Sequence, residues 1–464
     1  MKKSTFLIFL VVTISVSCIN AQTDKPNVVI FLADDLGYSD LSCYGSANVL
    51  TPVLDSLAAK GMKFTDFYAG SCVCSPSRAA LMTGKNATRT GIYSWIPADE
   101  PMHLRLSEVT IPEILKEAGY QTAHFGKWHL GLFGSEGDSW ISPSLTDHGF
   151  DYWFATDCNA MPTHKDPVNF IRNGVPVGKQ KGFACQLVAD ETIDWLKSSY
   201  DATEPFYLNV WFNEPHEIVA APEMYKKRHL ENGIDEHMAN YYGCIENMDH
   251  AVGRILRELD EMNALENTLV IFSSDNGSKQ AGSNGILRGM KSEVWEGGIR
   301  VPTIVTWKNH VPVQSICTDP CGLIDLFPTI HSMINSEHKL DYKMDGINIL
   351  PLLHGERLKR DKPLYVFYHR PAAASLRDGD WTLIGHLNER GPEINYFGEL
   401  QMKFIQGAFP ATFELYNLHD DIEQQHDVAG QNPHIVDRMK EEMIRLYSET
   451  IEDGGNWYEQ EPQP

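Results

Sequence analysis

Short apolar runs alternate with amphipathic stretches through most of the chain. Four runs, at residues 28–33, 122–125, 206–212 and 268–273, have the apolar character of buried parallel strands. Apolar residues spaced three and four apart over residues 245–262 predict an amphipathic helix. Strands that alternate with helices predict an α/β fold, in which a mixed, mainly parallel sheet is sandwiched by helices.

The pattern changes after about residue 360. Three short segments have the character of antiparallel strands, at residues 364–368, 381–384 and 413–416. A terminal helix is predicted after them, at residues 433–450. We therefore expect one large domain over residues 22–360 and a smaller C-terminal α+β subdomain over residues 361–464.

Residues 1–21 have the pattern of a secretory signal peptide. Two lysines precede an apolar run at residues 6–16, which is too short to span a bilayer. Cleavage after Ala21 would export the protein to the periplasm or the medium. Lipid attachment at Cys18 is the alternative, although Ser15 stands where a large aliphatic residue is expected. No later segment has the length and apolarity of a membrane span.

Composition narrows the classes of partner. The 464 residues include 62 acidic and 39 basic side chains, which gives a formal net charge of −23. With 42% hydrophobic residues the chain can build a large core, so it is neither disordered nor fibrous. The negative charge argues against nucleic acid as a partner, because a phosphate backbone requires a basic surface. An anionic substrate would require cationic groups concentrated at its site.

Polar side chains follow all four predicted strands. In open α/β sheets, ligands bind at the carboxyl ends of the strands. Carboxylates, an amide, a lysine and two histidines would therefore meet at one edge of the sheet: Asp34, Asp35, Lys127, His129, His216, Asp275 and Asn276.

A second candidate feature lies in residues 71–84. Ser75 is a good helix N-cap and Pro76 a good first helical residue, so a helix should begin just after Cys74. The Cys74 side chain would then lie at the positive end of the helix, where an anion is stabilised and a thiol is acidified. Arg78 lies one helical turn further and can reach the same place.

The string Cys74-Ser-Pro-Ser-Arg78, continued by Leu81 and Thr83-Gly84, resembles the signature of the type I sulfatases, which are related in fold to alkaline phosphatase. The resemblance extends over almost the whole chain after the signal peptide. It includes Asp34-Asp35-Leu-Gly37, Gly126-Lys-Trp-His129, Asp275-Asn-Gly277, Gly289-Met-Lys291, Glu296-Gly-Gly-Ile-Arg300-Val-Pro302, Asp345-Gly346, Leu350-Pro-Leu-Leu353 and Arg377-Asp-Gly-Asp-Trp381.

The resemblance implies that a formylglycine-generating maturase oxidises Cys74 to formylglycine, an aldehyde that hydrates to a gem-diol. One diol hydroxyl would attack the sulfur of a sulfate ester, and its oxygen would also be a metal ligand. The other ligands would be hard oxygen atoms, which favour one Ca²⁺ ion per chain over Mg²⁺: Asp34, Asp35, Asp275 and Asn276.

Family resemblance also implies roles for the remaining polar residues. Arg78, Lys127 and Lys291 would neutralise the sulfate group and the attacking oxygen. His216 would protonate the leaving oxygen, and His129 would take the proton from the second hydroxyl of residue 74.

Two other functions stay open. A phosphonate or phosphodiester hydrolase of the same superfamily can share this fold, and a non-catalytic glycan-binding protein would keep Cys74 unmodified. The chain is similar in character to polysaccharide sulfatases of marine bacteria that degrade algal glycans such as ulvan or carrageenan. We therefore expect a sulfated carbohydrate as the substrate.

Overall fold

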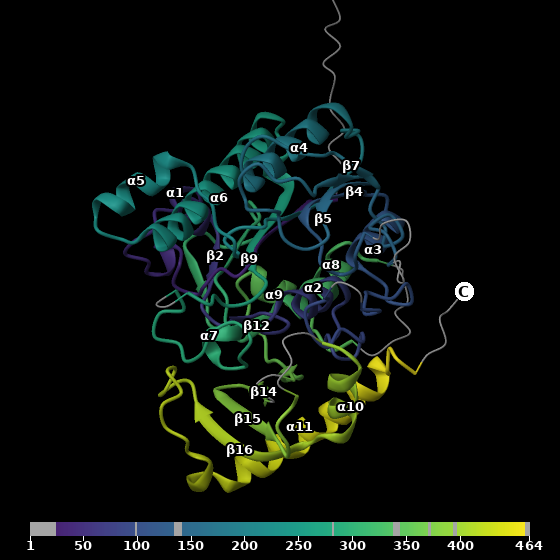
Figure 1. The fold of residues 1–464 in the computed structure, drawn as a ribbon, viewed down its shortest axis with the longest axis vertical. Coiled ribbons are helices and arrows are strands. Elements are labelled where there is room, and N and C mark those ends of the chain that lie inside the picture. The colour runs from purple at the N-terminus through teal and green to yellow at the C-terminus, as the bar shows by residue number, and fades with distance from the viewer. Residues whose placement is uncertain are drawn as a thin grey trace, which may run out of the picture.

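A ten-stranded sheet forms the centre of the protein (Figure 1). The computed structural model describes residues 25–97, 100–133, 142–280, 283–336, 344–369, 373–392 and 397–459; the predicted signal peptide and Cys18 lie outside them. The strand order is β11-β2-β10-β9-β1-β8-β4-β5-β6-β7. These strands are β1 (Asn27–Ala33), β2 (Met62–Phe64), β4 (Gln121–Lys127), β5 (Tyr152–Thr156), β6 (Ile171–Arg172), β7 (Val175–Pro176), β8 (Phe206–Trp211), β9 (Thr268–Ser274), β10 (Thr303–Thr306) and β11 (Ser315–Cys317).

The five central strands run parallel, and the sheet is mixed toward its edges. β9, β1, β8, β4 and β5 are parallel, whereas β10 is antiparallel to β9 and to β2. All four strands predicted from apolar runs are present as β1, β4, β8 and β9. The predicted mainly parallel α/β sheet is therefore confirmed.

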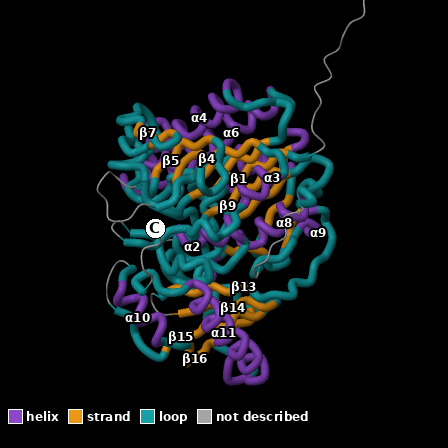
Figure 2. The backbone as a smooth tube through the Cα atoms, turned by 90° about the vertical axis from the view of Figure 1, so that its right-hand side faces the viewer, coloured by secondary structure: helices purple, strands orange, loops and turns teal. Residues whose placement is uncertain are grey.

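Helices cover both faces of the sheet, with α4 and α6 on one face and α2, α3 and α8 on the other (Figure 2). Alternate residues of β1 enter the two cores: Val28 and Ile30 face one, Val29 and Phe31 the other. The α-helices are α1 (Pro52–Lys60), α2 (Cys74–Thr83), α3 (Ile111–Glu117), α4 (Ala184–Ser198), α5 (Glu223–Glu231), α6 (Glu236–Glu261), α7 (Glu296–Ile299), α8 (Leu326–Met333), α9 (Leu350–Leu353), α10 (Glu399–Gly407) and α11 (Pro433–Gly454).

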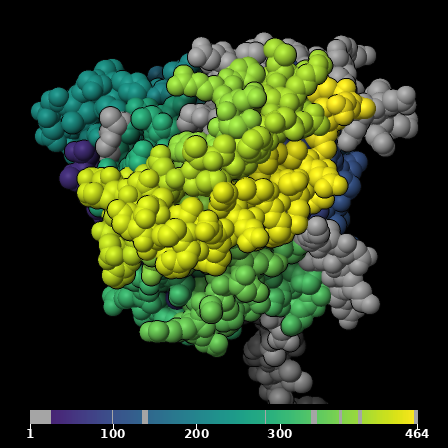
Figure 3. Space-filling model, turned by 90° about the horizontal axis from the view of Figure 1, so that it is seen from below, coloured from purple at the N-terminus to yellow at the C-terminus, as the bar shows by residue number. Residues whose placement is uncertain are grey.

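A separate antiparallel sheet follows residue 360, in the order β13-β14-β15-β16, and the long helix α11 packs against it. Together they cover much of the face seen in Figure 3. The strands are β13 (Leu364–Tyr368), β14 (Ala373–Asp378), β15 (Trp381–Leu387) and β16 (Pro410–Asn417), and a two-stranded sheet pairs β3 (Phe67–Tyr68) with β12 (Cys321–Gly322).

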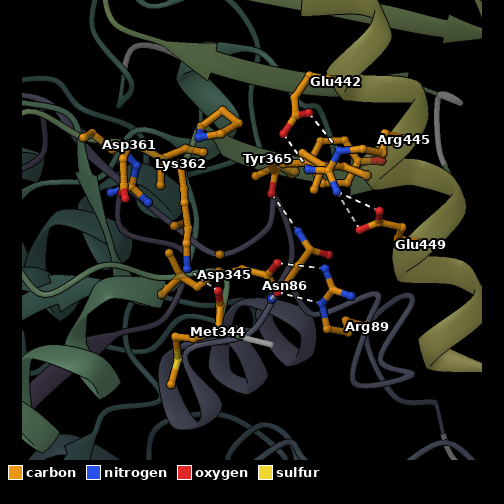
Figure 4. Close-up of a pocket in the computed structure, with 18 residues that line it drawn as sticks. Asn86, Arg89, Met344, Asp345, Asp361, Lys362, Tyr365, Glu442, Arg445 and Glu449 are labelled. Carbon is orange, nitrogen blue, oxygen red and sulfur yellow. Dashed lines mark hydrogen bonds and ion pairs between the residues drawn. The ribbon is translucent and has the colours of Figure 1, made fainter. Parts of the chain in front are cut away.

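A cavity of about 460 Å³ lies where this C-terminal part meets the rest of the chain (Figure 4). Arg89 donates to both carboxylate oxygens of Asp345 at 2.9 Å and also to Asp453 of α11. Asn86 donates to the backbone carbonyl of Tyr365 at 2.8 Å. Paired charges therefore hold the two parts together, and this cavity contains none of the predicted catalytic residues.

No helix within the described residues is long and apolar enough to cross a membrane.

Candidate active site

Cys74 is the first residue of α2, and the whole helix is buried. Val73, in an extended conformation, is the N-cap in place of Ser75, so the helix begins two residues earlier than predicted. Ser75 does not cap it; its Oγ accepts a hydrogen bond from the backbone N–H of Ile96 at 3.1 Å. The correction brings Cys74 into the first turn, where the helix dipole still favours a negative charge.

The carboxyl ends of β1 and β9 bring four predicted residues together beside Cys74. Because these strands are parallel neighbours, Asp34 and Asp35 leave the sheet next to Asp275 and Asn276. The backbone N–H of Asp35 donates to Asp275 Oδ1 at 3.2 Å, and Asn276 Nδ2 donates to Asp35 Oδ1 at 2.8 Å. Candidate ligand atoms of Asp34, Cys74 and Asp275 all lie within 4.8 Å of one another.

Two of these aspartates are each paired with a buried lysine. Lys127, the last residue of β4, donates to Asp34 Oδ2 at 2.6 Å. Lys291 donates to both oxygens of Asp35, at 2.5 and 2.7 Å. Burial alone would raise the pKa of both carboxyls, but these lysines and nearby cations hold each pKa below its usual range. Both carboxylates are therefore ionised and able to bind a cation.

Asp275 is paired with Arg78 from the second turn of α2. The guanidinium donates to Asp275 Oδ2 through Nε at 2.9 Å and Nη2 at 2.7 Å. Its Nη1 donates to the backbone carbonyl of Lys127 at 2.9 Å. Arg78 thus connects the helix that carries Cys74 to two strands of the sheet.

The buried oxygen atoms have the chemistry of a site for a hard divalent cation. Asp34 Oδ1 and Asn276 Oδ1 are both buried and accept no hydrogen bond from any described residue. Unsatisfied buried acceptors are costly, and a cation is the partner that carboxylate and amide oxygens would share. These residues therefore fit Ca²⁺.

His216 faces this cluster from the loop after β8. Its Nε2 lies 3.6 Å from Asp35 Oδ2, and its Nδ1 donates to the backbone carbonyl of Glu217 at 2.5 Å. Burial and the nearby Lys291 lower the pKa of His216 to about 4, in spite of the two aspartates. An anion bound beside it would raise that pKa again, because an opposite charge favours the protonated ring.

His129 is buried beside Cys158. Its backbone has a positive φ of 55°, and its N–H donates to the carbonyl of Asp157 at 2.8 Å. Its Nε2 lies 3.2 Å from the carbonyl of Ile96 and 3.4 Å from the thiol of Cys158.

Cys158 and Asn159 were not predicted from the sequence, although both touch the predicted set. Cys158 contacts His129, and the Oδ1 atom of Asn159 accepts a hydrogen bond from Lys127 at 2.9 Å. Both follow β5, whose sequence Tyr-Trp-Phe-Ala-Thr is an apolar run that could have revealed a further strand.

Known sulfatases are similar to this chain in sequence. A sequence model described as Sulfatase matches residues 26–336. N-acetylgalactosamine-6-sulfatase of Rattus norvegicus is 33% identical over 377 residues, which cover 74% of this chain and 68% of the relative. Arylsulfatase G of the same organism is 31% identical over 387 residues, which cover 72% of this chain and 70% of the relative.

Solved structures share the fold over nearly the whole chain. Ps i-CgsB in complex with k-i-k-neocarrahexaose matches with a TM-score of 0.79 and 26% identity, over 92% of this chain and 94% of that one. The PsFucS1 sulfatase from Pseudoalteromonas sp. matches with a TM-score of 0.74 and 24% identity, over 94% of this chain and 92% of that one.

Proposed function

The chain belongs to the sulfatase family, and from that premise we propose that it hydrolyses sulfate monoesters of a sulfated carbohydrate, with the nucleophile at residue 74. The observation that carries the proposal is the position of Cys74: it starts a buried helix, and its ligand atom lies within 4.8 Å of those of Asp34 and Asp275. Cys74 is thus buried among ionisable side chains, a placement typical of a functional cysteine.

Two groups complete this site. Formylglycine made from Cys74 by a maturase supplies, when hydrated, the hydroxyl that attacks sulfur, and Ca²⁺ supplies the charge that favours its deprotonated form. Residue 74, Asp34, Asp35, Asp275 and Asn276 would hold the ion. Because the ion would share the aspartates, the cationic groups of Arg78, Lys127 and Lys291 become able to neutralise the three sulfuryl oxygens.

The two histidines move protons. As the bond between sulfur and the carbohydrate oxygen breaks, His216 Nε2 gives its proton to that oxygen, which leaves as an alcohol. His129 accepts a proton from the remaining hydroxyl of residue 74, which releases sulfate. Water restores the hydrated aldehyde, so the products are an alcohol and sulfate.

Relatives and structural neighbours support a glycan as the substrate. One relative is an N-acetylgalactosamine-6-sulfatase, and one structural neighbour, Ps i-CgsB, was solved with a neocarrahexaose. We assign this chain a sulfated polysaccharide or its oligosaccharides, of the algal type exemplified by carrageenan and ulvan. The signal-like residues 1–21 support export to the periplasm or the medium, where such a polymer is met.

Peptide mass spectrometry tests the origin of the nucleophile. Co-expression with a formylglycine-generating maturase should make the peptide that contains residue 74 lighter by roughly 18 Da, since an aldehyde replaces a thiol. Cys72, buried in the same segment, is the internal control and should keep its thiol. A mature, active enzyme with an unmodified Cys74 would contradict the proposal, and an inactive one would favour a glycan-binding protein.

A further inference from the structure

A polar cluster includes Glu217, the residue that follows His216 in the chain. Glu217 Oε1 accepts hydrogen bonds from His237 Nε2 and from Gln280 Nε2, both at 2.7 Å. The side chains of Glu217 and His237 are 39% and 51% exposed, so the cluster faces solvent. We call Glu217, His237 and Gln280 the rim cluster.

The rim cluster joins three segments, two of which also position catalytic groups. The backbone carbonyl of Glu217 holds His216 Nδ1. Gln280 donates its N–H to Ser278 Oγ at 3.0 Å, and the carbonyl of Ser278 accepts from the backbone N–H of Lys291 at 3.2 Å. His237 lies in the first turn of α6. The cluster is therefore anchored to the loops that carry His216 and Lys291.

Within the described part of the chain, one carboxylate oxygen of Glu217 keeps unused acceptor capacity. Oε1 takes two short hydrogen bonds, whereas the contact of Oε2 is a long one, 3.4 Å from the backbone N–H of Val219. A carboxylate has about four acceptor positions. An exposed, oriented carboxylate of this kind binds hydroxyl donors well and repels a second anion.

We propose that Glu217 is a specificity determinant that selects the sugar attached to the leaving oxygen. Its Oε2 binds a free hydroxyl on the ring carbon next to the sulfated one. Its negative charge disfavours a second sulfate or a carboxylate on that carbon. The inference rests on the proposed sulfatase function. Arg78, Lys127 and Lys291 attract one sulfate group, while the carboxylate of Glu217 requires an uncharged substituent on the adjacent sugar carbon. The substrate class is a sulfated sugar with an unsubstituted vicinal hydroxyl.

The experiment compares kcat/KM for two substrates that differ in one group. One is a neutral monosulfated hexose, and the other is the same hexose with a second sulfate on the adjacent carbon. We expect the mature wild-type enzyme to prefer the monosulfated sugar by about tenfold or more, and Glu217→Gln to reduce that preference by about tenfold. Lys279→Gln is the matched control: Lys279 is exposed on the loop of Gln280 and outside the rim cluster, so the preference should not change.

Each outcome decides one question. An unchanged preference in Glu217→Gln, or a wild-type enzyme that prefers the disulfated sugar, would overturn the role of Glu217. An equal loss on both sugars would mean that the rim cluster only supports the His216 loop. An aryl sulfate, which carries no sugar hydroxyl, tests the proposed function separately. If the wild-type enzyme hydrolyses neither aryl nor sugar sulfates, the proposed function fails and the inference fails with it.

Discussion

Three buried aspartates of this site are each paired with a buried cationic side chain, and this pairing decides what the site can bind. Lys127, Lys291 and Arg78 balance the charge of Asp34, Asp35 and Asp275. A divalent cation on the aspartate side would give the pocket a net positive charge, although the whole chain carries −23. Substrate capture would therefore depend on the local field and not on the net charge of the protein.

Removal of the metal should abolish activity. Dialysis against a chelator should lower kcat/KM by at least about 100-fold, because a bound cation contributes several kcal/mol to transition-state stabilisation. Ca²⁺ should restore activity better than Zn²⁺, since the ligands are oxygen atoms. Elemental analysis of the active protein provides the check, and stoichiometric zinc would contradict this assignment.

Loss of His216 should matter most for poor leaving groups. His216→Ala should lower kcat/KM on a sulfated sugar by about 10²–10⁴-fold, the usual contribution of general acid catalysis. An aryl sulfate should lose at least about tenfold less, because a phenolate leaves without protonation. His129→Ala is the comparison variant and should lose activity equally on both substrates. Equal losses for His216→Ala would show that it is not the acid.

At the scale of elements, close packing of β4 against β8 positions Lys127. Gly126 has a φ of +105°, and a Cβ at this position would lie only 1.8 Å from the carbonyl oxygen of Trp211. Gly126→Ala should therefore lower the free energy of unfolding by more than about 3 kcal/mol.

The matched control for this variant is Gly119→Ala. Gly119 has a similar φ of +81°, but nothing lies within 4 Å of the place that an alanine Cβ would occupy, so only the backbone cost of about 1 kcal/mol should appear. Urea unfolding of both variants gives the two free energies. Similar losses would mean that crowding against β8 is not what requires glycine at residue 126.

Local sequence predicted the elements better than their contacts. The apolar runs identify β1, β4, β8 and β9 because strands buried on both faces are apolar throughout. The predicted start of α2 is wrong by two residues, since Ser75 bonds to Ile96 rather than capping its own helix. Cys158 and Asn159 were missed because β5 was not recognised. The rim cluster could not be predicted, because its three residues meet only through tertiary structure.

At the scale of the whole molecule, Arg89 connects distant parts of the chain. Its guanidinium binds Asp345 and Asp453 and is almost fully buried. Arg89→Ala would leave the partly buried Asp345 without its cationic partner, so we expect a loss of about 3–5 kcal/mol in the free energy of unfolding.

Arg445, on the same side of the cavity, is the control for this prediction. It is half exposed and pairs with Glu442 and Glu449 within α11, so Arg445→Ala should cost less than about 1 kcal/mol. Chemical unfolding of both variants makes the comparison. A similar cost for the two would show that Arg89 does not hold the C-terminal part in place.

Sequence motifs included Asp345 but gave no sign that Arg89 pairs with it and with Asp453 of α11, because ion pairs between remote segments leave no local pattern. The predicted short strands and terminal helix after residue 360 are present as β13, β15, β16 and α11. The domain boundary at residues 360–361 stays a prediction.

Sulfate release is the measurement that tests the sulfatase assignment most directly. The mature enzyme and Cys74→Ala are incubated with an aryl sulfate and with sulfated galactan oligosaccharides, and free sulfate is quantified by ion chromatography. We expect the wild-type enzyme to release sulfate and Cys74→Ala to release none above background, because alanine offers no oxygen for the attack on sulfur. Sulfate release by Cys74→Ala at a rate near that of the wild-type enzyme would contradict the account.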